Sequence, residues 1–186
     1  MKLEIPNSKL ELSEVERRAR RVKLLLMDCD GVLTDGRVTF LPDGDEWKSF
    51  HVHDGLGIAI CHQAGLKTGI VSGRKSSAVE RRARELGVAY LSQAAEDKAS
   101  AVDEILQQAK ISPRECAYIG DDLPDIAVMK KVELAIAVAN AVEETRRSAH
   151  YTTKLAGGNG AVREVAELIL KAQGRWEELI KGYVSI

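Results

Sequence analysis

The chain has 186 residues and a mass of 20.4 kDa, the size of one ordinary globular domain. Its 45% hydrophobic and 30% charged residues exclude the disordered class, and 27 basic against 28 acidic side chains disfavour a nucleic-acid partner. Its apolar runs are far shorter than the roughly 18 residues of a membrane span, no secretory signal opens it, and its three cysteines form no CxxC pair. We therefore expect a cytoplasmic protein with a single domain over residues 1–186 and no membrane partner.

Apolar runs alternate with helical patterns along the chain. A short helix over 15–21, capped by Ser13 and Glu16, precedes a strand over 22–27. Further strands are predicted over 66–71, 88–91, 116–119 and 134–138, and helices over about 77–86, 97–110, 123–130 and 141–148. Ser77 with Glu80 predicts a second capping box, and Gly87 a helix end. This alternation predicts a Rossmann-like α/β fold, a parallel sheet with helices on both faces, whose functional residues follow the carboxyl ends of the strands.

One segment, a β-hairpin insertion over 36–53, breaks the alternation. Residues 36–41 and 46–52 read as two strands around a turn at 42–45, and they include both phenylalanines and one of the two tryptophans. A two-stranded hairpin is only marginally stable alone, so this one must pack on another surface. Residues 175–186 read as a C-terminal tail that also needs a partner surface.

Acidic residues follow two of the predicted strands. Asp28 and Asp30 are two apart, so an extended chain presents both carboxylates on one side. Such a pair needs a shared proton or a cation, and Mg²⁺ prefers carboxylates combined with phosphate and water. The segment 120–125, with three further aspartates, would supply the remaining ligand. For either cluster alone, a turn capped by aspartate explains the pattern about as well.

Two more positions bear on phosphate binding. Ser72 and Gly73 end a predicted strand, where backbone N–H groups at a helix start hold phosphate oxygens. Lys98 opens the next helix and would place an ammonium group nearby. Taken singly, the serine is better explained as a helix cap and the lysine as solvated surface.

The order of these motifs decides between the readings. Asp28–Asp35, Ser72–Gly73, Lys98 and 120–125 together resemble the four signature motifs of the haloacid-dehalogenase-like hydrolases. Within that superfamily the chain is similar, nearly end to end, to the capless phosphatases of 3-deoxy-D-manno-octulosonate 8-phosphate (KDO 8-phosphate), through segments such as 156–164.

Two positions depart from that pattern. Relatives often carry arginine where this chain has Asn159, and some carry arginine where it has Ala59. Both positions bear on recognition of the sugar and neither belongs to the motif acids.

The resemblance implies a mechanism. Asp28 would attack phosphorus and form an aspartyl-phosphate, and Asp30 would act as acid and then as base. Mg²⁺ would be held by the Asp28 side chain, the Asp30 carbonyl and Asp121, while Ser72 and Lys98 bind the phosphoryl oxygens. Supporting roles, orienting Lys98 or metal-bound water, would fall to Asp122 and Asp125.

For the sugar acid, the resemblance implies contacts along the exit of the hairpin and from two arginines. These residues are His51, Val52, His53, Asp54, Gly55, Arg74 and Arg82, with Asp30 and Lys98 also touching substrate. His51 and His53 share a face of the predicted strand, which also suits a metal, but an exposed pair of histidines is ordinary.

The resemblance further implies a homotetramer that hydrolyses KDO 8-phosphate in lipopolysaccharide biosynthesis, with the hairpin in place of a cap domain. Three alternatives remain open: a related phosphatase of another sugar acid phosphate such as a nonulosonate 9-phosphate, a nucleic-acid 3′-phosphatase, and a non-catalytic scaffold. Arg74 favours the octulosonate, the net charge of −1 counts against nucleic acid, and the intact motif acids count against a scaffold.

Overall fold

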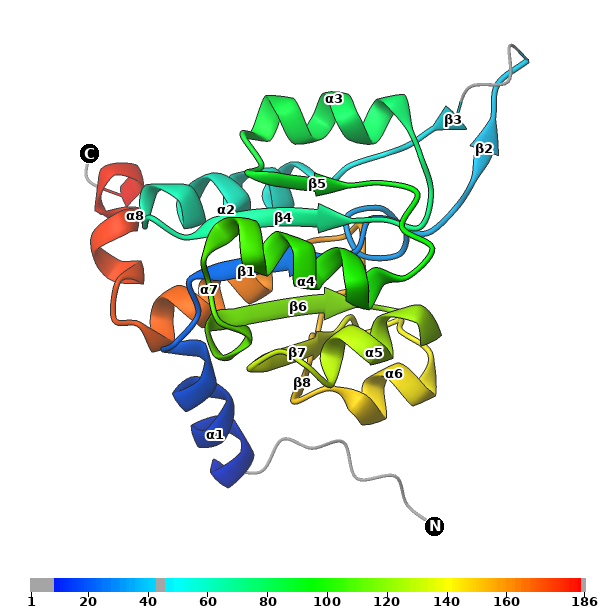
Figure 1. Cartoon of the computed structure of the whole chain (residues 1–186). Helices are drawn as coiled ribbons and strands as arrows, with labels where there is room; N and C mark the ends of the chain where they lie inside the picture. The colour runs from blue at the N-terminus through cyan, green and yellow to red at the C-terminus, as the bar shows by residue number, and fades with distance from the viewer. Residues whose placement is uncertain (1–8, 43–45, 185–186) are drawn as a thin grey trace.

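The computed structural model describes residues 9–42 and 46–184, and a parallel sheet of six strands lies at its centre (Figure 1). The strand order is β5-β4-β1-β6-β7-β8, and every neighbouring pair is parallel. The strands are β1 (Leu24–Met27), β4 (Lys67–Val71), β5 (Tyr90–Ser92), β6 (Cys116–Gly120), β7 (Leu134–Ala137) and β8 (Tyr151–Thr152). The predicted α/β fold is confirmed, and among these six strands only β8, two residues long, had no expected counterpart.

Helices cover both faces of the sheet, as the alternation predicts (Figure 1). On one face α2 (Val52–Gln63) packs on α7 (Ala161–Ala172), which also contacts α1 (Lys9–Ala19). On the other face lie α4 (Lys98–Ala109) and α5 (Ile126–Met129). The connections contain α3 (Ser77–Leu86), α6 (Glu143–Ser148) and two short 3₁₀ turns, η1 (Pro113–Glu115) and η2 (Leu123–Asp125).

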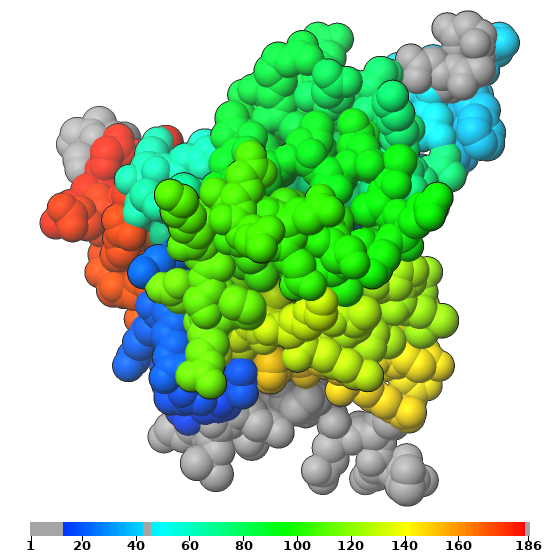
Figure 2. Space-filling model, in the orientation of Figure 1, coloured from blue at the N-terminus to red at the C-terminus, as the bar shows by residue number. Residues whose placement is uncertain are grey.

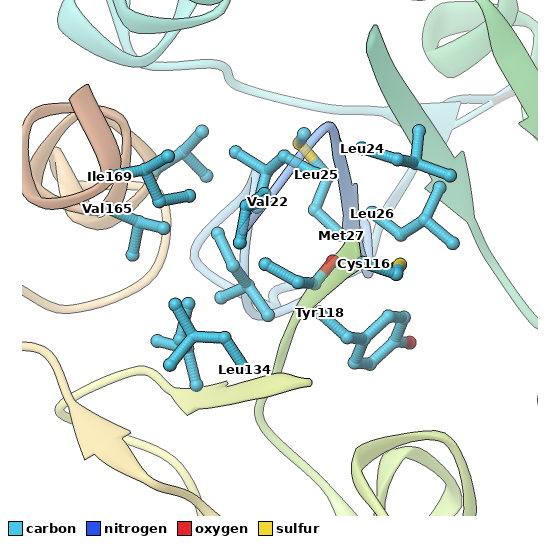
Figure 3. Close-up of a cluster of buried hydrophobic side chains, with 14 of the residues drawn as sticks. Val22, Leu24, Leu25, Leu26, Met27, Cys116, Tyr118, Leu134, Val165 and Ile169 are labelled. Atoms are coloured by element: carbon cyan, nitrogen blue, oxygen red, sulfur yellow. Dashed lines mark hydrogen bonds between the residues drawn. The ribbon is translucent and has the colours of Figure 1, made fainter. Parts of the chain in front are cut away.

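The core is built around β1, whose four residues are all buried because helices cover both of its faces. Figure 3 shows Val165 and Ile169 of α7 near Val22, with Tyr118 of β6 on the other side of β1. The chain turns to β4 on one side of β1 and later to β6 on the other. Such a reversal point, at the carboxyl ends of the strands, is where α/β sheets place their ligands.

The expected helix starts need two corrections. Helix α1 begins at Lys9, so Ser13 lies inside it and does not cap it. Helix α3 is preceded by Ser76, which makes no capping bond, so the box expected from Ser77 and Glu80 is wrong. Gly87 does end α3, with a φ of 67° that suits glycine.

The hairpin is formed by β2 (Thr39–Phe40) and β3 (Glu46–Trp47), which pair antiparallel. Figures 1 and 2 show it standing out from the body of the molecule. Most of its predicted turn, residues 43–45, lies outside the described residues. The second strand is much shorter than expected, because the chain enters α2 at Val52 with His51 as the cap.

Most of the C-terminal segment is a helix, α8 (Trp176–Val184), where a tail was expected. Trp176 is buried, and its ring lies 5.1 Å from the Arg163 guanidinium and 5.3 Å from the Lys171 ammonium of α7. The start of this segment therefore packs on α7 of the same chain, whereas a partner surface was expected, and residues 185–186 lie outside the described part. Within the described ranges, no helix is both long and apolar enough to cross a bilayer.

Candidate active site

The segments singled out in the sequence meet at one edge of the sheet. Asp28 follows β1, Ser72 follows β4, Asp121 follows β6, and Lys98 is the first residue of α4. The backbone N–H of Asp28 donates to the carbonyl of Ile119 at 2.9 Å, which continues the pairing of β1 with β6 into the loop. The sheet therefore brings these four side chains to the same place.

Lys98 joins two of the acids. Its Nζ lies 2.9 Å from Oδ1 of Asp28 and 2.7 Å from Oδ1 of Asp125, and its side chain is only 9% exposed. Burial favours the neutral amine, but the charges of Asp28 and Asp125 outweigh it and raise the pKa of Lys98. The reading of Lys98 as solvated surface is wrong, because the structure holds it as a buried, charged ammonium.

Asp125 is fully occupied by hydrogen bonds. Its Oδ1 accepts from Lys98 and from the Tyr118 hydroxyl, both at 2.7 Å. Its Oδ2 accepts from the backbone N–H groups of Asp121 and Asp122, at 2.9 and 3.1 Å. A carboxylate with both oxygens used this way positions Lys98 and the loop after β6. Tyr118 carried no sequence signal, because a tyrosine in a buried strand looks like any core residue.

Asp121 has an oxygen that the protein leaves unused. Its Oδ1 is buried and has no hydrogen-bond partner within the described residues. Carboxylate oxygens of Asp28, Asp121 and Asp125 lie within 4.8 Å of one another. Burial raises the pKa of Asp28 and of Asp121, and neighbouring carboxylates raise both further. With Asp125 occupied, Asp28 and Asp121 together are an oxygen donor set that fits a hard divalent cation.

Gly31 is needed for this arrangement. Its φ is +92°, and a Cβ there would lie 2.0 Å from Oδ2 of Asp121. The glycine loop, residues 157–160, packs on the same turn, since a Cβ at Gly157 would lie 1.6 Å from the Gly31 carbonyl oxygen. Only glycine therefore fits at positions 31 and 157, where the loop after β1 approaches Asp121 and the glycine loop most closely.

Asp30 lies at the mouth of the site, in contact with the hairpin. Lys48 donates to its Oδ1, and Nε of Arg74 lies 3.8 Å from its Oδ2. Glu46 pairs with Arg74 and has its Oε2 3.5 Å from Nζ of Lys48. We call these four residues, Asp30, Lys48, Glu46 and Arg74, the charge ring.

Lys48 and Glu46 were missed in the sequence. The available signal was alternation: residues 46 and 48 of a strand share one face, and Trp47 points the other way. Burial disfavours a charged lysine, but the hydrogen bond and charge of Asp30 outweigh it, so the pKa of Lys48 is raised.

Ser72 is buried directly after β4. Its hydroxyl oxygen accepts from the backbone N–H of Arg74 at 3.2 Å, and its own N–H donates to the Ser92 carbonyl at 2.9 Å. These bonds fix the turn that carries Arg74 to the charge ring.

The exit of the hairpin is a helix start. Nδ1 of His51 accepts from the N–H of His53 at 3.3 Å, while Val52 and His53 are exposed. The strand spacing that suggested a metal for the two histidines is therefore absent. Arg82 lies 5.9 Å from the Phe50 ring, and both line a cavity of about 460 Å³ together with Lys48, Ser49, Val52, Ala78, Arg81 and Glu85.

Two predicted residues face elsewhere. Asp54 is buried, and its carboxylate accepts from the N–H groups of Gly160 at 3.2 Å and Arg163 at 2.8 Å, at the start of α7. Asp122 accepts from the N–H of Leu123 and caps η2, without contact to Lys98. The geometry gives Asp54 a role in holding the glycine loop, and Asp122 a role in its own turn. Gly55 is buried beside the Arg82 guanidinium.

Comparison with known proteins agrees with this geometry. Residues 90–165 match the family model of haloacid dehalogenase-like hydrolases. The 3-deoxy-D-manno-octulosonate 8-phosphate phosphatase KdsC of Shigella flexneri is 42% identical over 166 residues, which cover 89% of this chain and 88% of that protein.

Solved structures are similar over almost the whole chain. A probable YrbI family phosphatase from Pseudomonas syringae pv. phaseolica is 45% identical, with a TM-score of 0.91 over 94% of this chain and 99% of its own. The Moraxella catarrhalis 3-deoxy-D-manno-octulosonate 8-phosphate phosphatase, in complex with a magnesium ion, a phosphate ion and KDO, is 43% identical, with a TM-score of 0.90 over 92% and 98%. The chain therefore belongs to the haloacid dehalogenase-like hydrolases and, within them, to the family of 3-deoxy-D-manno-octulosonate 8-phosphate phosphatases.

Proposed function

We propose that this protein hydrolyses KDO 8-phosphate to KDO and inorganic phosphate, with Mg²⁺ as cofactor. The observation that carries the proposal is the Asp28 carboxylate held by Lys98, next to an Asp121 oxygen that has no partner in the described chain. Relatives named as phosphatases of this substrate, one of them solved with magnesium, phosphate and KDO, support the choice of substrate and metal.

The reaction proceeds in two balanced steps. An oxygen of Asp28 bonds to phosphorus as the bond from phosphorus to the sugar oxygen breaks, and Asp30 gives its proton to that leaving oxygen. Water then attacks the phosphorus of the aspartyl-phosphate and gives a proton to Asp30, which restores Asp28 and releases phosphate. Lys98 and Ser72 bind the phosphoryl oxygens throughout, and Asp125 keeps Lys98 in place.

The metal would be held by the side chains of Asp28 and Asp121 and by the backbone carbonyl of Asp30. When bound, Mg²⁺ reduces the repulsion between an anionic nucleophile and an anionic phosphate. The protein's own part is to bury Asp28 and Oδ1 of Asp121, so that they need a cation, and to leave that Asp121 oxygen without a partner in the described chain.

The sugar acid would be recognised at the mouth of the site. Arg74 and Arg82 present guanidinium groups suited to a carboxylate, and Val52, in the segment His51–Gly55, lines the same cavity as Arg82. Asp54 contributes there by positioning the loop at Gly160. A nonulosonate 9-phosphate is the alternative substrate, because it offers the same phosphate and carboxylate with a longer sugar chain.

Phosphate release from a panel of substrates tests the proposal. The panel contains KDO 8-phosphate, a nonulosonate 9-phosphate, a sugar phosphate without a carboxylate and a DNA 3′-phosphate, each with Mg²⁺ and with EDTA. We expect kcat/KM to be highest for KDO 8-phosphate, by about tenfold or more, and EDTA to abolish turnover. A higher kcat/KM for the nonulosonate 9-phosphate would identify that compound as the substrate in place of KDO 8-phosphate. If no compound in the panel released phosphate, the proposal would be overturned.

We also propose that the protein is a cytoplasmic homotetramer. Phe40 and Trp47 on the hairpin are 69% and 64% exposed, and such apolar surface is typical of an oligomer contact. The reaction also benefits from a closed site, and 36–53 is too short for a cap domain. Three buried free thiols suit a reducing compartment, and a phosphorylated sugar does not cross membranes unaided.

Light scattering tests the assembly. We expect about four times 20.4 kDa for the wild type and a smaller species for Trp47→Glu, with the matched variant Leu91→Ser unchanged. Leu91 is also exposed, but it lies on β5, away from the hairpin. A fully active monomer at assay concentration would rule the tetramer out.

A further inference from the structure

We infer that Lys48 is a positioning residue that holds Asp30 in the orientation needed for proton transfer to the leaving group. The inference rests on the proposed function, since it gives Asp30 the role of acid and base. Lys48 belongs to the hairpin, which lies outside the six-stranded sheet (Figure 1). Its ammonium group donates to Oδ1 of Asp30.

The side chain of Lys48 is buried between two acidic residues. Its side chain is 1% exposed, although the neighbouring Trp47 is 64% exposed and the hairpin stands out from the body (Figure 2). Lysine is rarely buried so completely unless it is paired, because removing an ammonium from water is unfavourable. Here the pairing is double, with Asp30 on one side and Glu46 on the other.

The contacts divide the two oxygens of Asp30 between different tasks. Oδ1 accepts from Lys48. Oδ2 has Nε of Arg74 at 3.8 Å, beyond hydrogen-bond distance, so it stays available on the side of the proposed sugar-binding arginine. Lys48 thereby selects Oδ2 as the oxygen that carries the proton. Without Lys48 the Asp30 carboxylate, whose side chain is 20% exposed, loses this restraint, and both oxygens compete for that place.

Glu46 completes the arrangement by restraining the two cations. It pairs with Arg74 and its Oε2 lies 3.5 Å from Nζ of Lys48, so one acid links the two cations that face Asp30. The charge ring therefore fixes Asp30 through Lys48, directly after β3, and through Arg74, in the turn after β4, two segments that are separate in the chain. Lys48 needs no contact with substrate to act in this way.

The dependence on the leaving group provides the test. A sugar hydroxyl is a poor leaving group that needs protonation, whereas the nitrophenolate released from p-nitrophenyl phosphate does not. For Lys48→Met we expect kcat/KM to fall by about 100-fold with KDO 8-phosphate and by less than about threefold with p-nitrophenyl phosphate. A structural role would lower both rates by the same factor, and that outcome would overturn the inference.

A double-mutant cycle supplies a second readout. Asp30→Asn should lower activity on the sugar phosphate, and adding Lys48→Met should lower it no further, because Lys48 acts only through Asp30. Losses that multiply would contradict the inference. Lys131→Met is the matched control, since Lys131 pairs with Asp103 at 2.7 Å on the surface, and it should leave both activities unchanged.

Folding and function are separated by two further measurements. Thermal melting and light scattering of each variant show whether the assembly persists. Lys48→Gln, which keeps a neutral donor, is compared in parallel. The ratio of kcat/KM for KDO 8-phosphate to kcat/KM for p-nitrophenyl phosphate is then obtained even if the methionine variant does not fold. If the wild type itself releases no phosphate from KDO 8-phosphate, the proposed function fails. If the wild type does release phosphate and the ratio of the two kcat/KM values is the same in the Lys48 variants, only the role of Lys48 fails.

Discussion

Lys98 Nζ lies 2.9 Å from Oδ1 of Asp28. This contact places the proposed nucleophile and the main phosphate-binding cation in one hydrogen-bonded pair before substrate arrives. Asp125 holds the other side of the ammonium group, so Lys98 keeps a partner when Asp28 turns to phosphorus. The site is preorganised, which is the condition under which electrostatic groups contribute most to the rate.

Asp28→Asn should abolish turnover and leave the fold intact. The substitution removes the nucleophilic oxygen but changes little volume, and Lys98 retains Asp125. We expect kcat to fall by roughly 10⁴-fold or more, measured as phosphate release with Mg²⁺ present. Circular dichroism should be unchanged. Activity near that of the wild type would contradict the covalent mechanism.

Lys98→Ala should lower kcat by about 100-fold or more, because a preorganised cation on the phosphoryl group is typically worth ~3 kcal/mol. It should also destabilise the metal-free protein, since Asp28 and Asp125 lose their shared counter-charge. Steady-state kinetics and thermal melting measure the two effects, with Lys131→Ala as control. A change in kcat of less than about threefold would return Lys98 to a structural role.

The metal-free protein should lose stability as the pH rises. Burial and neighbouring carboxylates raise the pKa of Asp28 to about 6 and that of Asp121 to about 8, above the 3.8 of an unperturbed aspartate. Each carboxyl group holds its proton more tightly in the folded state than in the unfolded chain. Its contribution to stability is therefore complete below the pKa of the unfolded chain and is lost as the pH rises through the pKa of the folded state.

Mg²⁺ binding requires both carboxylates in their ionised form, so its affinity should increase over the same range. We expect the gain in Tm on adding Mg²⁺ to grow between pH 5.5 and pH 8.5, roughly the range that contains both raised pKa values. The control is Asp121→Asn, in which the gain should be small at every pH. A gain that shrank as the pH rose would contradict the assignment of Asp28 and Asp121 to the metal.

Asp54→Ala should destabilise the protein by about 2 kcal/mol, because two backbone N–H groups at the start of α7 lose a buried acceptor. Asp54→Asn keeps one acceptor oxygen and should be less destabilising. Urea unfolding measures both, and Asp103→Ala, at an exposed ion pair, is the control. No loss of stability in the alanine variant would show that Asp54 acts elsewhere, such as on substrate.

The sequence predicts the sheet and the place of Asp28 and Asp121 well, because both follow from local alternation and from the shared direction of parallel strands. Lys98 was placed at the site only by the order of the motifs, since alone it was better explained as solvated surface. The sequence does not predict Lys48, since its burial depends on how the hairpin folds back to Asp30. Ser13 failed as a cap for a related reason: α1 continues upstream of it, and a capping pattern does not exclude an earlier start.

The three cysteines, Cys29, Cys61 and Cys116, are free and buried in the folded chain, and Cys29 lies between the two aspartates of the first motif. Burial raises the pKa of each thiol, so few reactive thiolates form in the native state. A thiol reagent therefore reports how often the sheet opens, with no engineered label. The decrease in the rate of thiol modification on adding Mg²⁺ and phosphate would measure how far these ligands suppress opening of the sheet.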